Sequence, residues 1–297
     1  MIRVLLPAWL PALAACLFAG NLWAAAVARY QVTGLILNID KPHRTFSASC
    51  SEIPGYMKAM VMPIPVRESK ALAGLKPSMF VDFTLVVEKD RSWAENVRVH
   101  EYENLAQEPM LVRRLEMLAR LDKSNPAPAP LAIGAPVSDF TLTDQTGQRV
   151  SLSRFAGKVV AVTFIYTSCP LPDYCFRLSN NFARLRKRFA GRMGRDLVLL
   201  SISFDPVHDS PEVLAKYATT WKADPNSWRF LTGTPAEVKA VCRLFGLNFW
   251  PDEGTLAHSL HTLVIDREGK LAANFEGNQF SAEQLGDFVE TKLSHVR

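Results

Sequence analysis

Residues 159–175 of this chain are VVAVTFIYTSCPLPDYC, and this stretch decides the fold of the second half. It begins with Val159–Tyr166, a continuous apolar and β-branched run that is typical of a strand buried on both faces of a central sheet. Beyond the two cysteines, apolar side chains recur at helical spacing at Leu178, Phe182, Leu185 and Phe189. The stretch therefore predicts a central strand, a cysteine-bearing loop and a helix, in that order.

Strand and helix signals alternate on both sides of this stretch, from Ile133 to the C-terminus. We expect a hairpin and further strands in the segments Phe140–Asp144 with a turn at Gly147, Leu197–Phe204, Leu263–Ile265 and Leu271–Phe275. One helix begins at Ser210, whose hydroxyl suits an N-cap ahead of Pro211, and a last helix begins at Ser281. Residues 133–297 therefore predict a three-layer α/β domain with parallel and antiparallel strands.

The first half of the chain, residues 29–122, has the short strands and frequent turns of a small all-β domain. The expected strands are Tyr30–Ile39, Thr45–Cys50, Met79–Val87 and Ser92–Val99, separated by turns at 40–43, 74–77 and 89–91. These strands predict a small β-barrel or sandwich. After them, Leu111, Leu115 and Leu118 stand at helical spacing and indicate a helix.

A Pro/Ala alternation separates the two halves. Residues 125–130 are NPAPAP, which can neither continue a helix nor enter the middle of a sheet. We therefore expect residues 123–132 to be an extended, semi-rigid linker. A length of 297 residues also exceeds that of one typical domain, so the sequence predicts two domains.

The N-terminal segment, residues 1–28, predicts export. No charged residue stands between Arg3 and Arg29, and the small residues Ala24–Ala26 offer cleavage sites, so a removed signal peptide is the main interpretation. An uncleaved membrane anchor is one alternative, and a lipid attached to Cys16 is another. In each case the rest of the protein is expected in the periplasm or on the outer face of the inner membrane, where cysteine pairs can be oxidised.

Composition and charge exclude several classes of protein. The chain is 48% hydrophobic and 21% charged, which is ordinary for a globular protein and unlike a collagen, a disordered chain or a polytopic membrane protein. The net charge of +5 is scattered, and the basic run 184–188 is expected to be the solvated face of a helix, so no nucleic acid partner is predicted. Five cysteines are too few to build a disulfide scaffold.

Cys169 and Cys175 stand where the predicted helix begins. The unpaired N–H groups and the positive dipole end of a helix favour a thiolate over a thiol, so these cysteines are expected to be nucleophilic or metal-binding. Pro172 suits the first helical turn, which would put Cys169 on the incoming loop and Cys175 within that turn. A structural disulfide is the alternative. Cys242 has apolar neighbours at helical spacing and is expected to be a buried, inert thiol.

Several motifs of the second half occur in the order found in the Sco/SenC family. They are IGAP at 133–136, FTLTD at 140–144, FIYTSCP at 164–170, SISFDP at 201–206, DSP at 209–211, HS at 258–259 and LVID at 263–266. The chain resembles this family, which implies a thioredoxin-like fold, copper binding by two cysteines and a distant histidine, and a role in assembling the copper centre of cytochrome oxidase. The resemblance assigns the ligands to Cys169, Cys175 and His258. Five residues separate these cysteines, where the family usually has three.

Two soft thiolates and an imidazole suit copper, as Cu(I) or Cu(II). Zinc is the chemical rival, but structural zinc normally takes four protein ligands and only three are visible. His261 is a possible substitute ligand, and we expect it to be a surface histidine instead. His208 is expected to be a solvated loop residue. Asp205 is expected to form a turn before Pro206, with a docking or supporting role as the alternative.

The first half carries a second group of sulfur-bearing residues. Three of the eight methionines, Met57, Met60 and Met62, fall within six positions, shortly after Cys50. If Met60 and Met62 lie on a strand, their side chains project from the same face, and thioethers are soft donors that select Cu(I). The alternative is a barrel interior packed with adaptable methionines.

The motifs around these methionines resemble the periplasmic copper-binding modules of the CusF-like class. They are YQVTG at 30–34, IPGYM at 53–57, AMVMP at 59–63 and LKP at 75–77. The resemblance implies a small five-stranded, OB-like barrel that holds Cu(I) near one end. That class normally has a histidine ten residues before the first methionine of the M-x-M pair, and this chain has Cys50 there. Cys50 could serve as a ligand or could pair with another cysteine.

Together these features predict an exported copper chaperone. The methionine site would capture Cu(I) and pass it across the linker to Cys169, Cys175 and His258 by ligand exchange, and the recipient implied by the resemblance is a cytochrome oxidase subunit with a copper centre. Such a protein transfers metal and is not an enzyme. The alternative is a periplasmic thiol-disulfide oxidoreductase, in which Cys169 and Cys175 act on partner cysteines and are recycled by a thiol-disulfide reductant. Copper storage without a specific partner is a third possibility.

Overall fold

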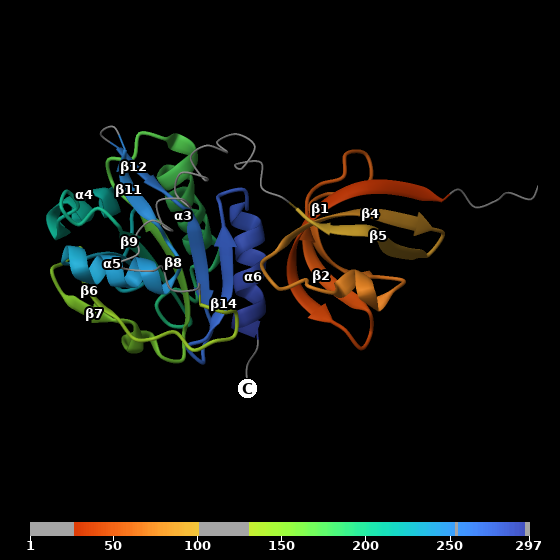
Figure 1. Cartoon of the computed structure of the whole chain (residues 1–297), viewed down its shortest axis with the longest axis horizontal. Helices are drawn as coiled ribbons and strands as arrows, with labels where there is room; N and C mark the ends of the chain where they lie inside the picture. Colours follow the sequence, from red (N-terminus) through yellow and green to blue (C-terminus); the bar gives the residue numbers. More distant parts are fainter. Residues whose placement is uncertain (1–26, 101–130, 253–254, 295–297) are drawn as a thin grey trace, which may run out of the picture.

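The structure is a computed structural model, and it describes residues 27–100, 131–252 and 255–294. Its described strands form a five-stranded sheet near the N-terminus, a seven-stranded sheet in the C-terminal half and a separate two-stranded hairpin. Figure 1 shows the N-terminal sheet and the C-terminal α/β region lying side by side. The predicted signal peptide or anchor with Cys16, the helix near 111–118 and nearly all of the linker lie outside the described residues.

The N-terminal sheet is antiparallel, with strand order β3-β2-β1-β4-β5. Its strands are β1 (Ala28–Asp40), β2 (Thr45–Cys50), β3 (Met60–Pro65), β4 (Phe80–Glu88) and β5 (Arg91–Val99), with a short 3-10 helix, η1, at Ser69–Leu72. The sheet curls until Val66 forms an isolated bridge with Ala94, just beyond β3 and within β5. The hydrogen-bonded ladder nevertheless ends at β3 and β5, so the predicted closed barrel is not confirmed.

The two faces of this sheet belong to different hydrophobic cores, because successive side chains of a strand point to opposite faces. One face, here called the core face, packs a core of its own with Ile36, Phe46, Ala48, Cys50, Ile64, Val81 and Phe83. The other, here called the interface face, adds Leu35, Leu37 and Phe80 to the core of the α/β region. The N-terminal sheet is therefore fixed to the rest of the molecule by its second face.

The C-terminal sheet has strand order β14-β13-β8-β9-β10-β6-β7. Its strands are β6 (Thr141–Asp144), β7 (Arg149–Ser151), β8 (Val159–Ile165), β9 (Leu197–Ser203), β10 (Trp228–Thr232), β13 (His261–Ile265) and β14 (Leu271–Glu276). The central strands β8, β9 and β10 pair in parallel, and the outer pairs are antiparallel. This mixture confirms the expected α/β class, and β8 is buried along its whole length, as its apolar run predicts.

Helices connect and cover these strands. They are η2 (Leu152–Phe155), η3 (Pro172–Phe176), α3 (Arg177–Arg188), α4 (Pro211–Thr220), α5 (Pro235–Leu244) and α6 (Ala282–Ser294). The expected cap of α4 is present, since the Val213 N–H donates to the Ser210 hydroxyl, and Ser281 accepts from the Gln284 N–H at the start of α6. A separate hairpin of β11 (Phe249–Asp252) and β12 (Thr255–His258) precedes β13.

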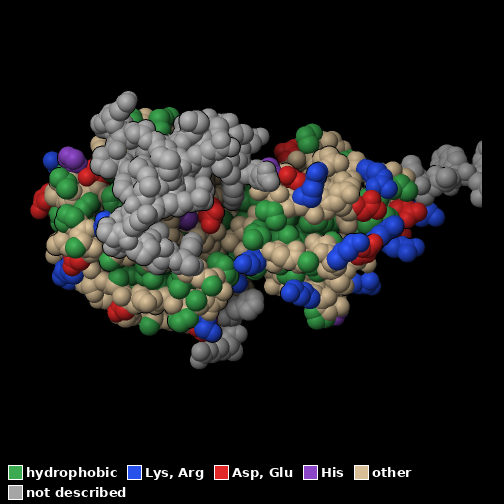
Figure 2. Space-filling view, viewed as in Figure 1, with side chains coloured by type: hydrophobic (Ala, Val, Ile, Leu, Met, Phe, Trp, Pro, Cys, Tyr) green, Lys and Arg blue, Asp and Glu red, His purple; other side chains and the backbone are tan. Residues whose placement is uncertain are grey.

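Helices α3 and α6 run parallel and are joined by ion pairs in register. Arg184 pairs with Glu283, Arg188 with Asp287 at 2.8 Å, and Arg192, just beyond α3, with Glu290 at 3.1 Å. Arg184 and Arg188 belong to the run expected to be the solvated face of a helix, and their side chains are exposed there while also pairing with α6. Elsewhere, Figure 2 shows Lys and Arg interspersed with Asp and Glu on the N-terminal sheet, in agreement with scattered charge.

Candidate functional site

The two cysteines of the second half lie at the carboxyl end of β8, on the loop that leads into α3. After Tyr166 the chain turns, and η3 forms one irregular turn with Pro172 at its first position. Tyr174 interrupts this turn with φ −107° and ψ −107°, so α3 begins only at Arg177. Cys175 therefore lies in the turn directly ahead of α3, and Cys169 lies on the incoming loop, as the sequence predicts.

The thiols of Cys169 and Cys175 are free and hydrogen-bonded to each other, but their surroundings differ. Cys175 is buried, whereas Cys169 is partly exposed. The hydrogen bond from Cys175, with smaller support from the Leu171 backbone and the Tyr166 hydroxyl, lowers the pKa of Cys169 to about 5. The same hydrogen bond, burial and the charge on Cys169 raise the pKa of Cys175. At neutral pH the pair is thus one partly exposed thiolate beside one buried thiol.

A buried carboxylate, to which the sequence motifs assign no role, holds this loop. Asp209, fully buried, accepts hydrogen bonds from the N–H and hydroxyl of Thr167, at 3.0 and 2.5 Å, and from the hydroxyl of Ser203 at 2.5 Å. Thr167 stands two residues before Cys169, so Asp209 ties the cysteine loop to the end of β9. Its place at the start of the DSP motif, in the loop between β9 and α4, is the signal that could have found it.

His258 ends β12 and is enclosed by aromatic rings. Its ring centroid lies 4.6 Å from that of Phe204, 5.9 Å from Tyr166 and 6.3 Å from Tyr174. Burial lowers the pKa of His258 to about 4, so the imidazole is neutral at ordinary pH. The Nδ1 atom lies 3.0 Å from the Ser259 carbonyl oxygen, which fixes the proton on Nδ1 and leaves the lone pair of Nε2 for a ligand.

The structure brings the two thiols together and places His258 beside the same loop, through Tyr166 and Tyr174. It does not set the three side chains in metal-binding geometry: among the described residues, no three His, Cys, Asp or Glu side chains are so arranged. The donor set nevertheless fits a soft metal ion, because it combines an accessible thiolate, a second thiol and a neutral imidazole with a free Nε2. The chemistry of the residues therefore suits copper.

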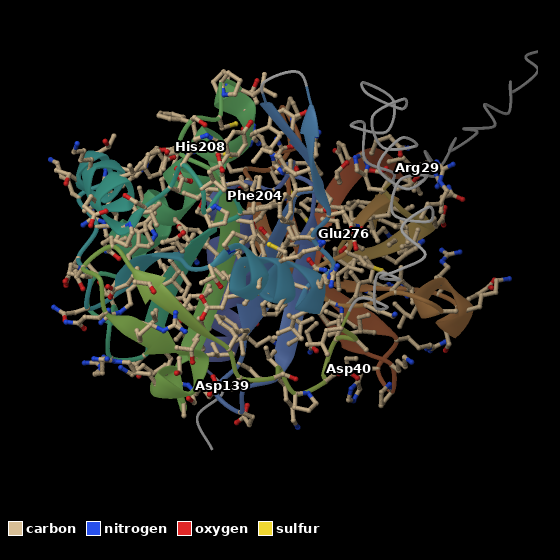
Figure 3. The ribbon with its side chains drawn as sticks, turned by 60° about the vertical axis from the view of Figure 1, so that its left-hand side comes forward. Arg29, Asp40, Asp139, Phe204, His208 and Glu276 are labelled. Carbon is tan, nitrogen blue, oxygen red and sulfur yellow. The ribbon has the colours of Figure 1, made fainter. Side chains whose placement is uncertain are left out.

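The structure also tests what the sequence predicts for His261, His208 and Asp205. His261 is only 7% exposed, and its Nδ1 lies 3.0 Å from the Asn274 amide oxygen, so the prediction of a surface histidine is wrong. It is buried because β13 lies between β8 and β14. His208 is exposed, as expected, and pairs with Asp205 at 2.9 Å. The Asp205 carbonyl oxygen accepts from the backbone N–H groups of His208 and Asp209, which confirms the turn. Figure 3 shows Phe204 and His208 toward one end of the α/β region and Asp139 at the other.

In the N-terminal sheet, strand register places the other predicted sulfur ligands on one face. Cys50 pairs with Met60 and Ala48 with Met62, so Met60 and Met62 lie on the core face with Cys50. Met57 bridges to Ile53 and packs against the same core. Met60 is 51% exposed, whereas Cys50 is buried and burial raises its pKa to about 12. Cys50 is a free thiol, and Cys242 is free and buried, as predicted.

Within the described residues, no helix combines the length and hydropathy needed to cross a membrane.

Comparison with known proteins places the C-terminal half in a family. The chain is 28% identical over 145 residues to the SCO1 protein homolog of Bacillus subtilis, an alignment that covers 48% of this chain and 74% of that protein. Among solved structures, Arabidopsis thaliana ScoI with copper bound is 26% identical, with 56% of this chain and all of that chain covered and a TM-score of 0.47. BsSco, described as having a disulfide switch and as a member of the Sco family of cytochrome c oxidase assembly proteins, is 25% identical, with 57% and 98% covered and a TM-score of 0.47. The family model described as SCO1/SenC matches residues 132–294, more than half of the chain, so this protein belongs to the SCO1/SenC family.

Proposed function

We propose that this protein is an exported copper chaperone that holds copper, as cargo, between Cys169, Cys175 and His258, and delivers it to a copper-centre subunit of cytochrome oxidase. The observation that carries this proposal is the thiolate-thiol pair beside a neutral histidine whose Nε2 has no hydrogen-bond partner among the described residues. Membership of the SCO1/SenC family supports it, since Sco1 homologues are copper-binding proteins of cytochrome c oxidase assembly. The site of action is the periplasm or the outer face of the inner membrane.

Each residue of this site would have its own part in taking up the ion. Cys169 is the accessible thiolate and makes the first contact with incoming Cu(I). A cation at Cys169 cancels the negative charge that raises the pKa of Cys175, so Cys175 can then lose its proton to solvent and bind as a second thiolate. His258 adds its Nε2 after the cysteine loop and the histidine approach each other. Release to a partner reverses these ligand exchanges.

We further propose that residues 29–122 form a CusF-like accessory domain with a Cu(I) site built from Met57, Met60, Met62 and Cys50. The shared core face of β2 and β3 supports this grouping. The Cys50 thiol is the ligand hardest to use, because burial raises its pKa to about 12 and it must lose its proton to bind. The three thioethers need no deprotonation and are expected to make the first contacts.

A second candidate function, thiol-disulfide exchange, is favoured by the difference between the two cysteine pKa values. A partly exposed thiolate such as Cys169 attacks a partner disulfide, and a buried thiol such as Cys175 resolves the mixed disulfide by releasing the partner's reduced thiol. The oxidised pair is then reduced by an external dithiol. This chemistry requires neither His258 nor a metal. Removal of His258 should therefore impair copper binding and leave thiol-disulfide exchange unchanged.

The test compares His258→Ala with His208→Ala, a matched control that removes an exposed histidine from a nearby loop. We expect His258→Ala to weaken Cu(II) binding by at least about tenfold and to change the thiolate-to-copper absorption, because it removes a ligand. We expect His208→Ala to change neither. Both variants should reduce a model disulfide at the wild-type rate. Unchanged copper binding in His258→Ala would favour the oxidoreductase instead.

A further inference from the structure

We propose that the contact between the N-terminal sheet and α6 is a spacer that holds the Cys50–Met60–Met62 cluster away from the Cys169–Cys175 pair, so that copper passes between the two sites only from one molecule of this protein to another. The inference rests on the proposed copper-binding function, because it concerns the route between its two sites. Three features of the structure carry it: the direction of the side chains, the contacts of the spacer and the length of α3.

Neighbouring rows of side chains across the N-terminal sheet point in opposite directions. Leu35 pairs with Phe80 on one side and Ser49 on the other, and this row faces the α/β region. In the next row Gly34 pairs with Val81 and Cys50, and Cys50 pairs with Met60. Because adjacent residues of a strand alternate between faces, the sulfur cluster lies on the side of the sheet opposite the α/β region.

The interface face is held by polar and apolar contacts together. The Ser49 hydroxyl donates to the Asp287 carboxylate of α6 at 2.7 Å, and Asp287 also pairs with Arg188. Leu35 and Leu37 are buried in the core of the α/β region, at no more than 2% exposure. Figure 1 shows α6 between the N-terminal strands and the α/β sheet. These contacts fix where the N-terminal sheet stands relative to α3 and α6.

The length of helix α3 gives an estimate of the distance between the Cys50–Met60–Met62 cluster and the Cys169–Cys175 pair. Cys175 lies just before its first residue, Arg177, whereas Ser49 is joined through Asp287 to its last residue, Arg188. At about 1.5 Å per residue, a helix of this length spans roughly 18 Å. The thickness of α6 and of the N-terminal sheet adds to this distance, so the two sulfur sites are about 20 Å apart or more.

Ligand exchange requires donor and acceptor residues to bind one ion at the same moment, which a gap of this size prevents. The relay within one molecule that the sequence analysis expects therefore does not fit this arrangement. Both sites are open to a second molecule, because large exposed apolar side chains lie beside each: Tyr56 and Met60 at one, and Leu171, Phe176 and Val207 at the other. The N-terminal cluster of one copy can thus meet the cysteine pair of another.

The first test measures the separation without copper. Nitroxide labels are placed on Cys169 and on a Lys58→Cys variant, since Lys58 is exposed between Met57 and Met60. We expect pulsed electron resonance to give one narrow distance distribution centred beyond about 20 Å. A population below about 15 Å would overturn the proposal, whether or not either site binds copper.

A matched pair of variants tests the spacer itself. Asp287→Ala removes the carboxylate shared by Ser49 and Arg188, whereas Glu283→Ala removes a carboxylate of the same ion-pair row that contacts only Arg184 through its side chain. We expect the distance distribution to broaden in Asp287→Ala and to stay narrow in Glu283→Ala. A wild-type distribution in Asp287→Ala would contradict the role given to this contact.

The second test follows copper. The Cys169–Cys175 pair is oxidised, one Cu(I) per chain is loaded on the N-terminal cluster, and the disulfide is then reduced with a phosphine. Arrival of copper is detected as protection of Cys169 from iodoacetamide. We expect the half-time to fall about tenfold when the protein concentration rises tenfold, as for a bimolecular step. A half-time independent of concentration would overturn the proposal. Failure of the oxidised protein to take up copper would instead disprove the accessory site, and the distance measurement would still decide the spacer.

Discussion

The thiol pair is the most informative feature at the scale of single residues, because its two members are chemically unlike. In metal-free protein we expect iodoacetamide to modify Cys169 with a rate that rises through a pKa of about 5 and is level from pH 7 to 9. The pKa of Cys169 is lowered because the hydrogen bond from Cys175 stabilises the thiolate. Cys175→Ala removes that donor, so the midpoint should move up toward the ordinary value of 9.0. Mass spectrometry measures both profiles, and a shared profile would contradict the assigned cause.

Asp209 supplies a second prediction at this scale. Asp209→Ala leaves the Thr167 N–H and hydroxyl and the Ser203 hydroxyl without their acceptor, so it should lower the free energy of unfolding by about 3 kcal/mol. Asp224→Ala is the control, because Asp224 accepts comparable bonds from Asn226 in an exposed turn and should cost less than about 1 kcal/mol. Urea denaturation followed by tryptophan fluorescence compares them. Equal losses would show that Asp209 does not hold the loop.

At the candidate site, the position of the cysteines in the fold could be predicted from the sequence, whereas the surroundings of the proposed ligands could not. Cys169, Cys175 and His258 stand in recognisable motifs, and the helix start beside Cys175 follows from Pro172 and the apolar spacing. The contact of Tyr174 with His258 depends on an interrupted turn, which no local pattern signals. The burial of His261 depends on which strands flank β13, and that is settled by long-range pairing.

At the scale of elements, caps decide where helices begin, and α5 gives the sharpest test. The Thr234 hydroxyl accepts from the Glu237 N–H, and the Glu237 carboxylate accepts from the Thr234 N–H, which completes a capping box. Thr234→Ala should therefore lower the free energy of unfolding by about 1 kcal/mol. Thr219→Ala, whose hydroxyl donates only to the Ala215 carbonyl within α4, should change it by less than about 0.5 kcal/mol. Chemical denaturation measures both, and a neutral Thr234→Ala would contradict the capping role.

Strands with a clear apolar pattern can be predicted from the sequence. A strand whose burial depends on a residue of a distant strand cannot. The sequence predicts the cores of β8 and β9, because these segments are rich in apolar and β-branched residues, and it predicts Thr45–Cys50 from the turn that precedes it and its alternation of residues. It misses β10, whose five residues include Arg229. That arginine is buried because Asp144 of β6 pairs with it. A charged residue argues against a buried strand until its partner on a distant strand is known.

At the scale of the whole molecule, the contact between the N-terminal sheet and α6 joins the part of the chain that carries the Cys50–Met60–Met62 cluster to the part that carries Cys169 and Cys175. The alternation of residues in β1, β2 and β4 could have indicated a sheet with two apolar faces, since Leu35 and Ile36, like Phe80 and Val81, are both buried. The sequence does not say what covers the second face. That α6 covers it follows only from the structure, in which Ser49 and Asp287 meet across 238 positions of the chain.

The most direct test of the account is an anaerobic Cu(I) titration of the reduced protein against a competing chelator. It compares the wild type with Cys169→Ser/Cys175→Ser and with Cys50→Ser/Met60→Leu. We expect two bound copper ions in the wild type and the loss of one, at a different site, in each variant. If the wild type and Cys169→Ser/Cys175→Ser bind copper equally, the cysteine pair is not a copper site and the chaperone function proposed for it is wrong.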